Sequence, residues 1–272
     1  MKGSRRAALS LLLMSWCLIG QSDTGSEEWT TFIAWMKALP PGVLPSGRLA
    51  PFDGYRKKLM AAGMPPKDVE ALVARLQKRA EDNPEYTAVN LNRVYSQGGR
   101  EFNHRDQPNA FLVETVGAMR PGRVLDLGMG EGRNAIYLAQ RGWDVVGLDV
   151  SDVGVAHAKE SAGRAGVRID ARVQDIYTFD FGTSQWDLVC LMYFPIPDTR
   201  QGLYQKIATG LKPGGYVIAE GLGAPAMETL LQARARWEAT ELHLLRMEYL
   251  EAMGDWGSRP GPFGRLLLQK PY

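Results

Sequence analysis

The sequence is poor in cysteine, in histidine and in net charge, and its cysteine count and charge balance each exclude a class of protein. Two cysteines among 272 residues cannot support a disulfide-rich scaffold. The 32 basic residues nearly balance the 30 acidic ones, so there is no sign of a nucleic-acid-binding surface. A hydrophobic content of 45% and a charged content of 23% instead indicate a globular chain with a sizeable core.

The first 22 residues carry no acidic side chain and differ from the rest of the chain. Basic residues precede an uncharged stretch over 7–20, which is shorter than the about 17–25 residues of a membrane-spanning helix. Residues 1–22 are therefore predicted to be a signal peptide, with a short N-terminal anchor or a wrongly chosen start codon as alternatives. Cys17 would leave with the signal, and Cys190 is expected to be a buried, unreactive thiol because its neighbours are apolar.

Residues 23–95 are predicted to form a helical extension. Ser26 is a suitable N-cap for a helix that ends near Met36, and a Pro- and Gly-rich stretch then runs to Gly54. A second helix begins at Pro65-Pro66, where apolar residues recur at helical spacing. A third follows Pro84 and ends near Tyr95.

Residues 96–272 are predicted to form a doubly wound α/β domain, because short runs of strand-forming residues alternate with segments of helical pattern. A Pro- and Gly-rich connection near the end, Pro260-Gly261-Pro262 included, indicates a hairpin added at the sheet edge. Strands are predicted over 123–127, 144–149, 168–173, 187–193, 215–220, 245–253 and 264–269, and helices near 133–141, 152–165, 200–211 and 226–241.

The stretch VLDLGMGEGRN, residues 124–134, ends a strand in three closely spaced glycines. Glycine is needed where the backbone takes a positive φ or approaches something bulky, and such a turn before a helix is where a doubly wound sheet holds a nucleotide-like ligand. The P-loop is excluded, because Arg133 and Asn134 follow Gly132 in place of Lys and Ser or Thr. The dinucleotide pattern G-x-G-x-x-G fails too, since its third glycine would fall at Arg133. The glycines follow the spacing G-x-G-x-G instead, and an adenosyl group without phosphates is the third candidate, so further anchors have to decide between these ligands.

Two further anchors favour an adenosyl ligand. Asp149 closes the second strand, 21 positions after Gly128, where a carboxylate can accept hydrogen bonds from both ribose hydroxyls. Asp175 follows the third strand, where it can accept from an adenine amine while the Ile176 N–H donates to a ring nitrogen. The alternative for each aspartate taken alone is that it only caps a turn.

These anchors, with LKPGGY over 211–216 before the fifth strand, make residues 107–272 resemble class I S-adenosylmethionine-dependent methyltransferases. GMGEGRN over 128–134 and RGWDV over 141–145 are similar to the small-molecule branch that includes tellurite-resistance and thiol methyltransferases. The resemblance implies a seven-stranded, mostly parallel sheet whose last strand is antiparallel, and S-adenosyl-L-methionine as the cofactor. It also implies this set of cofactor-binding residues: Asp126, Gly128, Met129, Gly130, Asp149, Val150, Asp175, Ile176 and Met192.

The chemistry implied by the resemblance is transfer of a methyl group to a small-molecule acceptor. Such a transfer needs mainly alignment and exclusion of water, so no catalytic residue is assigned, and His104 and Tyr193 are only candidates. We predict no metal site and no nucleic-acid partner, and contact with a membrane only if residues 1–22 stay attached as an anchor. The alternative is a non-catalytic module that binds the cofactor and a protein partner.

Two questions stay open in the sequence. The signal-like start points to export, whereas S-adenosylmethionine is made inside the cell, so the localisation is undecided. The segment over 95–109 contains a Gly-Gly pair, and either it is a lid, with Tyr95 closing over the adenosyl group, or it is a linker between the extension and the core.

Overall fold

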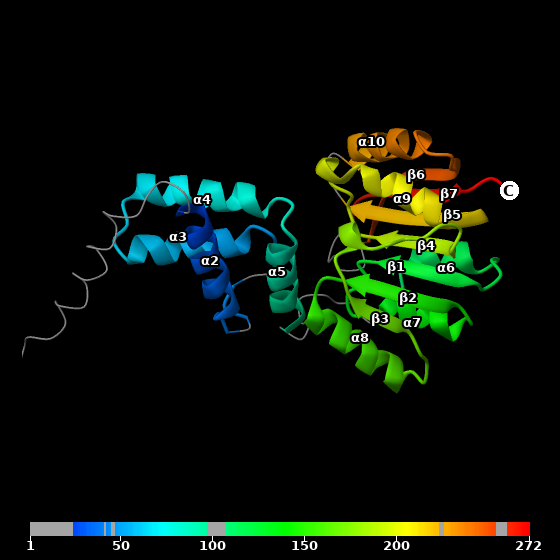
Figure 1. Ribbon diagram of the computed structural model, residues 1–272, viewed down its shortest axis with the longest axis horizontal. Helices are drawn as coiled ribbons and strands as arrows, with labels where there is room; N and C mark the ends of the chain where they lie inside the picture. The colour runs from blue at the N-terminus through cyan, green and yellow to red at the C-terminus, as the bar shows by residue number, and fades with distance from the viewer. Residues whose placement is uncertain (1–23, 41, 45–46, 97–106, 223–225, 254–259) are drawn as a thin grey trace, which may run out of the picture.

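The computed structural model describes residues 24–40, 42–44, 47–96, 107–222, 226–253 and 260–272, and these form a helical extension beside a larger sheet domain (Figure 1). The predicted leader over 1–22 lies outside the described residues. No helix in the described part of the chain is both long and apolar enough to span a bilayer.

The helical extension has a core of its own. Phe32 lies at its centre, with ring centroids 5.2 Å from Phe52 and 5.1 Å from Tyr55, and Tyr86 stacks on Phe52 at 5.2 Å. Apolar side chains of all four helices close around these rings. The helices are α2 (Thr24–Lys37), α3 (Ala50–Ala61), α4 (Pro66–Ala80) and α5 (Pro84–Ser96).

Helix α3 was missed in the sequence analysis, because it begins at Ala50, within the Pro- and Gly-rich stretch that runs to Gly54. Pro51 lies in the first turn of α3, where a missing N–H costs nothing. Gly54 is packed so closely that an added Cβ would lie 2.6 Å from Leu44 and 3.2 Å from Trp35. Close packing, rather than a turn, therefore accounts for this glycine.

The second group of elements is one sheet of seven strands in the described residues, in the order β3-β2-β1-β4-β5-β7-β6. Strand β7 is antiparallel to both of its neighbours, and the other pairs are parallel, as the resemblance implied. The strands are β1 (Arg123–Leu127), β2 (Asp144–Asp149), β3 (Asp170–Val173), β4 (Trp186–Met192), β5 (Leu211–Leu222), β6 (His243–Met253) and β7 (Pro260–Gln269).

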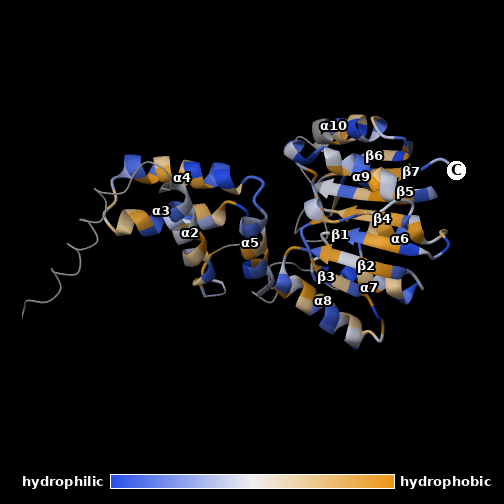
Figure 2. Ribbon diagram, viewed as in Figure 1, coloured by the Kyte–Doolittle hydropathy of each residue, from blue (hydrophilic) through white to orange (hydrophobic). Residues whose placement is uncertain are grey.

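Helices cover both faces of the sheet, because successive strand residues point to opposite sides. Val124 and Leu188 pack with α6 and α7, whereas Leu125 and Val189 pack with α9 and α10. In Figure 2, apolar colour continues across the central strands. The flanking helices are α6 (Ala110–Val116), α7 (Arg133–Gln140), α8 (Asp152–Arg164), α9 (Gly202–Gly210) and α10 (Ala226–Glu238).

The hairpin of β6 and β7 confirms the predicted edge addition, but the connection is shorter than expected. Pro260 and Pro262 belong to β7 and pair with β6, whereas the pairing of β7 with β5 extends only to Phe263. The two prolines thus lie in the part of β7 that pairs only with β6. On the opposite side of β7 the described residues place no strand at this point, so a missing proline N–H costs no hydrogen bond between strands there.

Candidate functional site

The glycine turn lies at the carboxyl edge of the sheet, between the two halves of its strand order. Strand β1 is followed on one side by β2 and β3 and on the other by β4 and β5, so the crossing direction reverses between β1 and β4. Open α/β sheets bind ligands in the crevice that this reversal leaves at the carboxyl ends of the strands. Figure 1 shows the extension beside this edge, with α5 next to α8.

The backbone of the turn is fixed by hydrogen bonds to β2. The N–H groups of Gly128 and Met129 both donate to the Leu148 carbonyl, at 2.9 and 3.0 Å. Gly128 and Gly130 take φ values of +71° and +56°, a region that a side chain makes costly. Cβ atoms added here would lie 2.9 Å from the Phe194 ring and 2.7 Å from the Tyr95 hydroxyl oxygen. The turn is therefore bordered by Phe194 on one side and by Tyr95 of the extension on the other.

Asp149 joins the glycine turn to the start of α8. Its Oδ2 accepts from the Gly130 N–H at 2.9 Å, and its Oδ1 accepts from the Ser151 N–H at 2.8 Å. The side chain is buried, and burial raises the pKa of Asp149 while the N–H groups of Ser151, Gly130 and Val150 lower it. This carboxylate thus holds the turn in place as well as facing the crevice edge.

Asp126 lies within β1, where it pairs in register with Gly147 of β2 on one side and with Cys190 of β4 on the other. It is 1% exposed, and its Oδ2 has no hydrogen-bond partner within the described residues. Burial raises the pKa of Asp126 to about 7; Arg133 acts against this rise and Asp149 adds to it. A buried carboxyl oxygen without a partner is an acceptor that a ligand can use.

The remaining sequence-predicted residues lie along the same edge. Asp175 caps the short 3₁₀ turn Ile176–Thr178 and accepts from the Tyr177 N–H at 3.0 Å, so it does cap a turn. Ile176 is buried beneath it, and Val150 follows β2 half-buried. Met129 lies in the glycine turn after β1, Met192 is the last residue of β4, and each is 6% exposed.

Comparison with known proteins matches residues 124–215, from β1 into β5, to the methyltransferase domain family. Curated relatives include ribosomal protein L11 methyltransferase of Symbiobacterium thermophilum, 35% identical over 42% of this chain and 36% of that protein. They also include ubiquinone biosynthesis O-methyltransferase of Bordetella avium, 31% identical over 40% of this chain and 46% of that protein. A probable S-adenosyl-L-methionine-dependent methyltransferase, TehB of Haemophilus influenzae, is 34% identical over 24% of this chain and 23% of that protein.

Residues 124–215 are a class I S-adenosylmethionine-dependent methyltransferase domain. The TehB match supports the likeness to the tellurite-resistance branch. A putative methyltransferase structure from Bacillus halodurans shares the fold, with a TM-score of 0.51 and 12% identity, over 60% of this chain and all of that one. The chain spans roughly a quarter to a half of the length of the three curated relatives named above.

A polar cluster, which sequence analysis missed apart from Tyr193, lies at the β4–β5 side of the methyltransferase domain. Glu220 Oε1 accepts from the Tyr193 hydroxyl and from Asn109 Nδ2, both at 2.6 Å, and Glu220 Oε2 accepts from Arg265 Nε at 2.6 Å. Tyr193 has a φ of +59°, which costs a residue with a side chain about 1–2 kcal/mol. Glu220 was detectable as the lone charge in the apolar run of β5, but its partners come from three distant segments.

The extension meets both sides of the methyltransferase crevice. Asn92 of α5 accepts from the Ser151 hydroxyl and donates to Asp152 at the start of α8. Asp82, between α4 and α5, pairs with Arg200 at 2.7 Å, beyond the end of β4. The extension therefore spans the crevice from the β2 side to the β4 side.

Within the described residues, Cys190 and His157 add no further group to the site. Cys190 is fully buried, as predicted, and burial raises the pKa of its thiol. His157 contacts Glu131 at 2.8 Å on the surface of α8, and His104 lies outside the described residues. The described residues hold no cluster of side chains suited to a metal.

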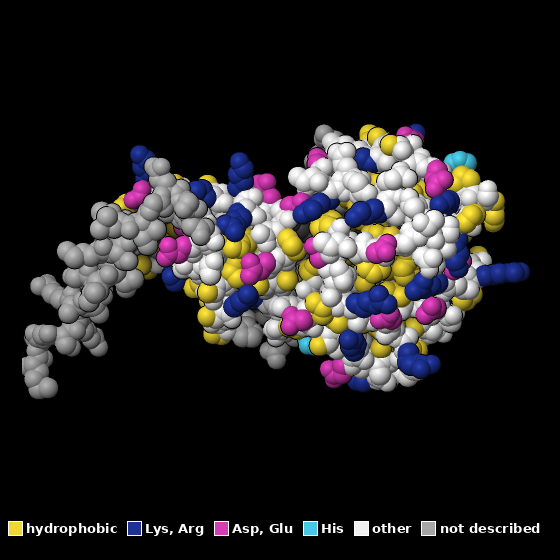
Figure 3. Space-filling model, in the orientation of Figure 1, with side chains coloured by type: hydrophobic (Ala, Val, Ile, Leu, Met, Phe, Trp, Pro, Cys, Tyr) yellow, Lys and Arg dark blue, Asp and Glu magenta, His cyan; other side chains and the backbone are white. Residues whose placement is uncertain are grey.

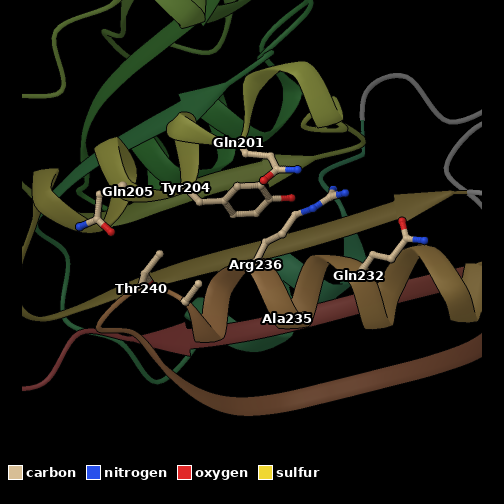
Figure 4. Close-up of a pocket in the computed structure, with 8 residues that line it drawn as sticks. Gln201, Tyr204, Gln205, Gln232, Ala235, Arg236 and Thr240 are labelled. Carbon is tan, nitrogen blue, oxygen red and sulfur yellow. The ribbon is translucent and has the colours of Figure 1, made fainter.

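A groove between α9 and α10 is separate from the crevice of the methyltransferase domain. Figure 4 shows Tyr204 and Arg236 facing each other there, with glutamine side chains of both helices around them. None of the predicted cofactor-binding residues lines this groove.

Proposed function

We propose that this protein transfers a methyl group from S-adenosylmethionine to a small-molecule acceptor by in-line displacement. The observation that carries the proposal is the pairing of a glycine turn, tight enough to exclude any Cβ, with a buried Asp126 oxygen that has no partner in the described residues. Both features fit an adenosyl cofactor with a cationic amino-acid end. The curated relatives described above are methyltransferases as well.

A small-molecule acceptor is favoured by charge and by likeness. Figure 3 shows basic and acidic side chains interspersed over the visible face, without the basic patch that binding to nucleic acid would need. One relative is named for ubiquinone biosynthesis, whereas another is named for ribosomal protein L11. Methyl transfer to a protein is therefore the alternative that the experiment has to distinguish.

We assign the predicted residues to parts of the cofactor. Asp149 would accept from the ribose hydroxyls, and Asp175 with the Ile176 N–H would hold the adenine. Asp126 would face the methionine moiety, and the backbone of Gly128, Met129 and Gly130 would lie beneath the ligand. Val150 and Met192 would form the apolar wall on either side.

The cofactor, when bound, supplies a methyl group on a sulfonium sulfur that is already activated for displacement. The protein contributes alignment and exclusion of water, which together lower a barrier by up to about 7–11 kcal/mol. We propose that residues 23–95 act as a cover for this purpose and that residues 96–272 are the catalytic domain. Tyr95 against Gly130 and the contacts of Asn92 and Asp82 support that division.

The function is tested by calorimetric titration with S-adenosylmethionine and S-adenosylhomocysteine, followed by a methyl-release screen. The screen should contain small hydroxyl and thiol compounds in one arm and a total protein extract in the other. Transfer confined to small molecules supports the proposal, whereas transfer confined to protein contradicts it. Tight binding with no transfer in either arm would favour the non-catalytic module.

Replacing Asp149 by Ala should weaken S-adenosylhomocysteine binding. The change removes charge-assisted hydrogen bonds to the ribose, each worth at most about 1.5–3 kcal/mol, and frees the Gly130 N–H that Asp149 holds. We expect a dissociation constant about ten- to a hundredfold higher by calorimetry. Asp144→Asn, at the exposed start of the same strand, is the control. An unchanged constant in folded Asp149→Ala would remove the ribose assignment.

If the extension is a cover, S-adenosylhomocysteine should slow hydrogen exchange at the end of α5 around Tyr95. The expected reason is that a ligand held over Gly130 makes the Tyr95 contact more persistent. Exchange at α4, on the far side of the extension core, should change little. Equal exchange around Tyr95 with and without saturating ligand would show that the extension does not respond to the site.

A further inference from the structure

The polar cluster of Glu220, Tyr193, Asn109 and Arg265 lies on the β4–β5 side of the crevice, where Met192 is the only one of the predicted cofactor residues. The glycine turn, Asp149 and Asp175 lie at the ends of β1, β2 and β3, whereas Tyr193 follows β4 and Glu220 pairs beside it in β5. A methyl acceptor has to approach from the β4–β5 side if the cofactor occupies the other.

Two consecutive residues connect the cluster to the cofactor side. Phe194 lies against Gly128 of the glycine turn, while the hydroxyl of Tyr193 reaches Glu220. The Tyr193 ring is held at its face by Phe263, with centroids 6.3 Å apart and an edge-on angle of 76°. Tyr193 also has a positive φ, and strained backbone of this kind is concentrated at functional sites.

The side chains of the cluster differ in how far they are exposed to solvent. Tyr193 is half-buried, whereas the Glu220 side chain is only 2% exposed, so the tyrosine is the more accessible member of this pair. Arg265 balances the charge of Glu220 and also lies 3.7 Å from Glu248, while Asn109 donates to Glu220 and, at 3.3 Å, to the Tyr193 oxygen. The buried Glu220 carboxylate, which can accept a proton, thus lies behind the Tyr193 hydroxyl.

We propose that Tyr193 and Glu220 receive the proton of the methyl acceptor, and that the acceptor is therefore an uncharged hydroxyl or thiol compound. This inference rests on the proposed function. As the acceptor oxygen or sulfur forms its bond to the methyl carbon, its O–H or S–H electron pair stays on that atom. The released proton passes to the Tyr193 oxygen while the Tyr193 proton moves to Glu220 Oε1. The sulfonium takes the electron pair of the broken carbon–sulfur bond and becomes a neutral thioether, so charge and atoms balance.

The test compares the full-length protein with its Tyr193→Phe and Glu220→Gln variants. Phenol, 4-nitrophenol and thiophenol serve as acceptors, with iodide as an acceptor that has no proton to lose. Tyr249→Phe, an exposed tyrosine on β6, is the matched control. Calorimetry with S-adenosylhomocysteine checks that each variant keeps its cofactor site.

For Tyr193→Phe we expect kcat with phenol to fall by about 10²–10⁴ at neutral pH, with S-adenosylhomocysteine affinity unchanged within about twofold. The loss should shrink as pH rises towards ionisation of the acceptor, and it should be smaller for the more acidic 4-nitrophenol. Transfer to iodide should be unaffected, and Glu220→Gln should follow the same pattern with a smaller loss.

A loss that is equal for iodide and phenol, or equal at every pH, would mean that Tyr193 has a structural role and would overturn the inference alone. So would a wild-type protein that methylates only iodide. Wild-type protein that binds S-adenosylhomocysteine yet transfers methyl to none of the four acceptors would overturn both this inference and the proposed transfer to small molecules.

Discussion

The free protein is expected to lose stability as pH rises from about 4 to 7, and Asp126→Asn should remove most of this loss. The pKa of Asp126 is about 7 in the folded chain, against 3.8 for an unperturbed aspartate. Between these values the folded state keeps a proton that the unfolded state has released. Stability therefore falls by about 1.4 kcal/mol for each pH unit, or about 4 kcal/mol across the window.

The measurement is the unfolding temperature of ligand-free protein at several pH values from 4 to 8. For a domain of this size, about 4 kcal/mol corresponds to roughly 10 °C. Asp126→Asn should give a flatter curve and the higher unfolding temperature at pH 8, since no charge is then buried. Asp144→Asn, whose side chain is 76% exposed, should leave the slope unaltered. A wild-type curve that rises between pH 4 and 7 would contradict the assignment.

Gly130→Ala should abolish measurable cofactor binding. The new Cβ would sit on backbone at φ +56°, a strain of about 1–2 kcal/mol, and 2.7 Å from the Tyr95 hydroxyl oxygen. The Tyr95 side chain must then move away, which disturbs its contact with the turn. We expect S-adenosylhomocysteine to bind at least a hundredfold more weakly in calorimetry.

Two variants separate the causes of that loss. Gly163→Ala lies in α8, where an added Cβ has no heavy atom within 4 Å, so binding should be unchanged and stability slightly higher. Tyr95→Ala combined with Gly130→Ala relieves the contact but not the φ strain, and it should restore only part of the affinity. Full affinity in the single Gly130→Ala variant would mean that the turn does not lie beneath the ligand.

The fold and the glycine turn were predictable because their signals are local. The residue patterns typical of strands and helices can be recognised within windows of about ten residues. The predicted bounds of β1 and β2, 123–127 and 144–149, are those of the structure. The spacing from Gly128 to Asp149 is likewise short, because one strand–helix–strand unit joins them.

The polar cluster was not predictable, because its four members are separated by long stretches of chain. Asn109, Tyr193, Glu220 and Arg265 come together only through the order of strands β4, β5 and β7 and the position of α6. A single sequence contains no signal for such long-range hydrogen bonds. The contact of Tyr95 with Gly130 was not predicted, since the sequence only left residues 95–109 as either a lid or a linker.

The separate core of the helical extension has a consequence for how the chain melts. Its aromatic cluster shares no residue with the cores of the sheet, and the named contacts between the two parts are few: polar ones at Asn92 and Asp82, and the Tyr95 side chain against Gly130. Weakly coupled units of this kind need not unfold in one all-or-none transition. We expect calorimetric scans to show the extension and the sheet as two transitions, with Asp126 titration moving only that of the sheet, so no single free energy of unfolding describes the whole protein.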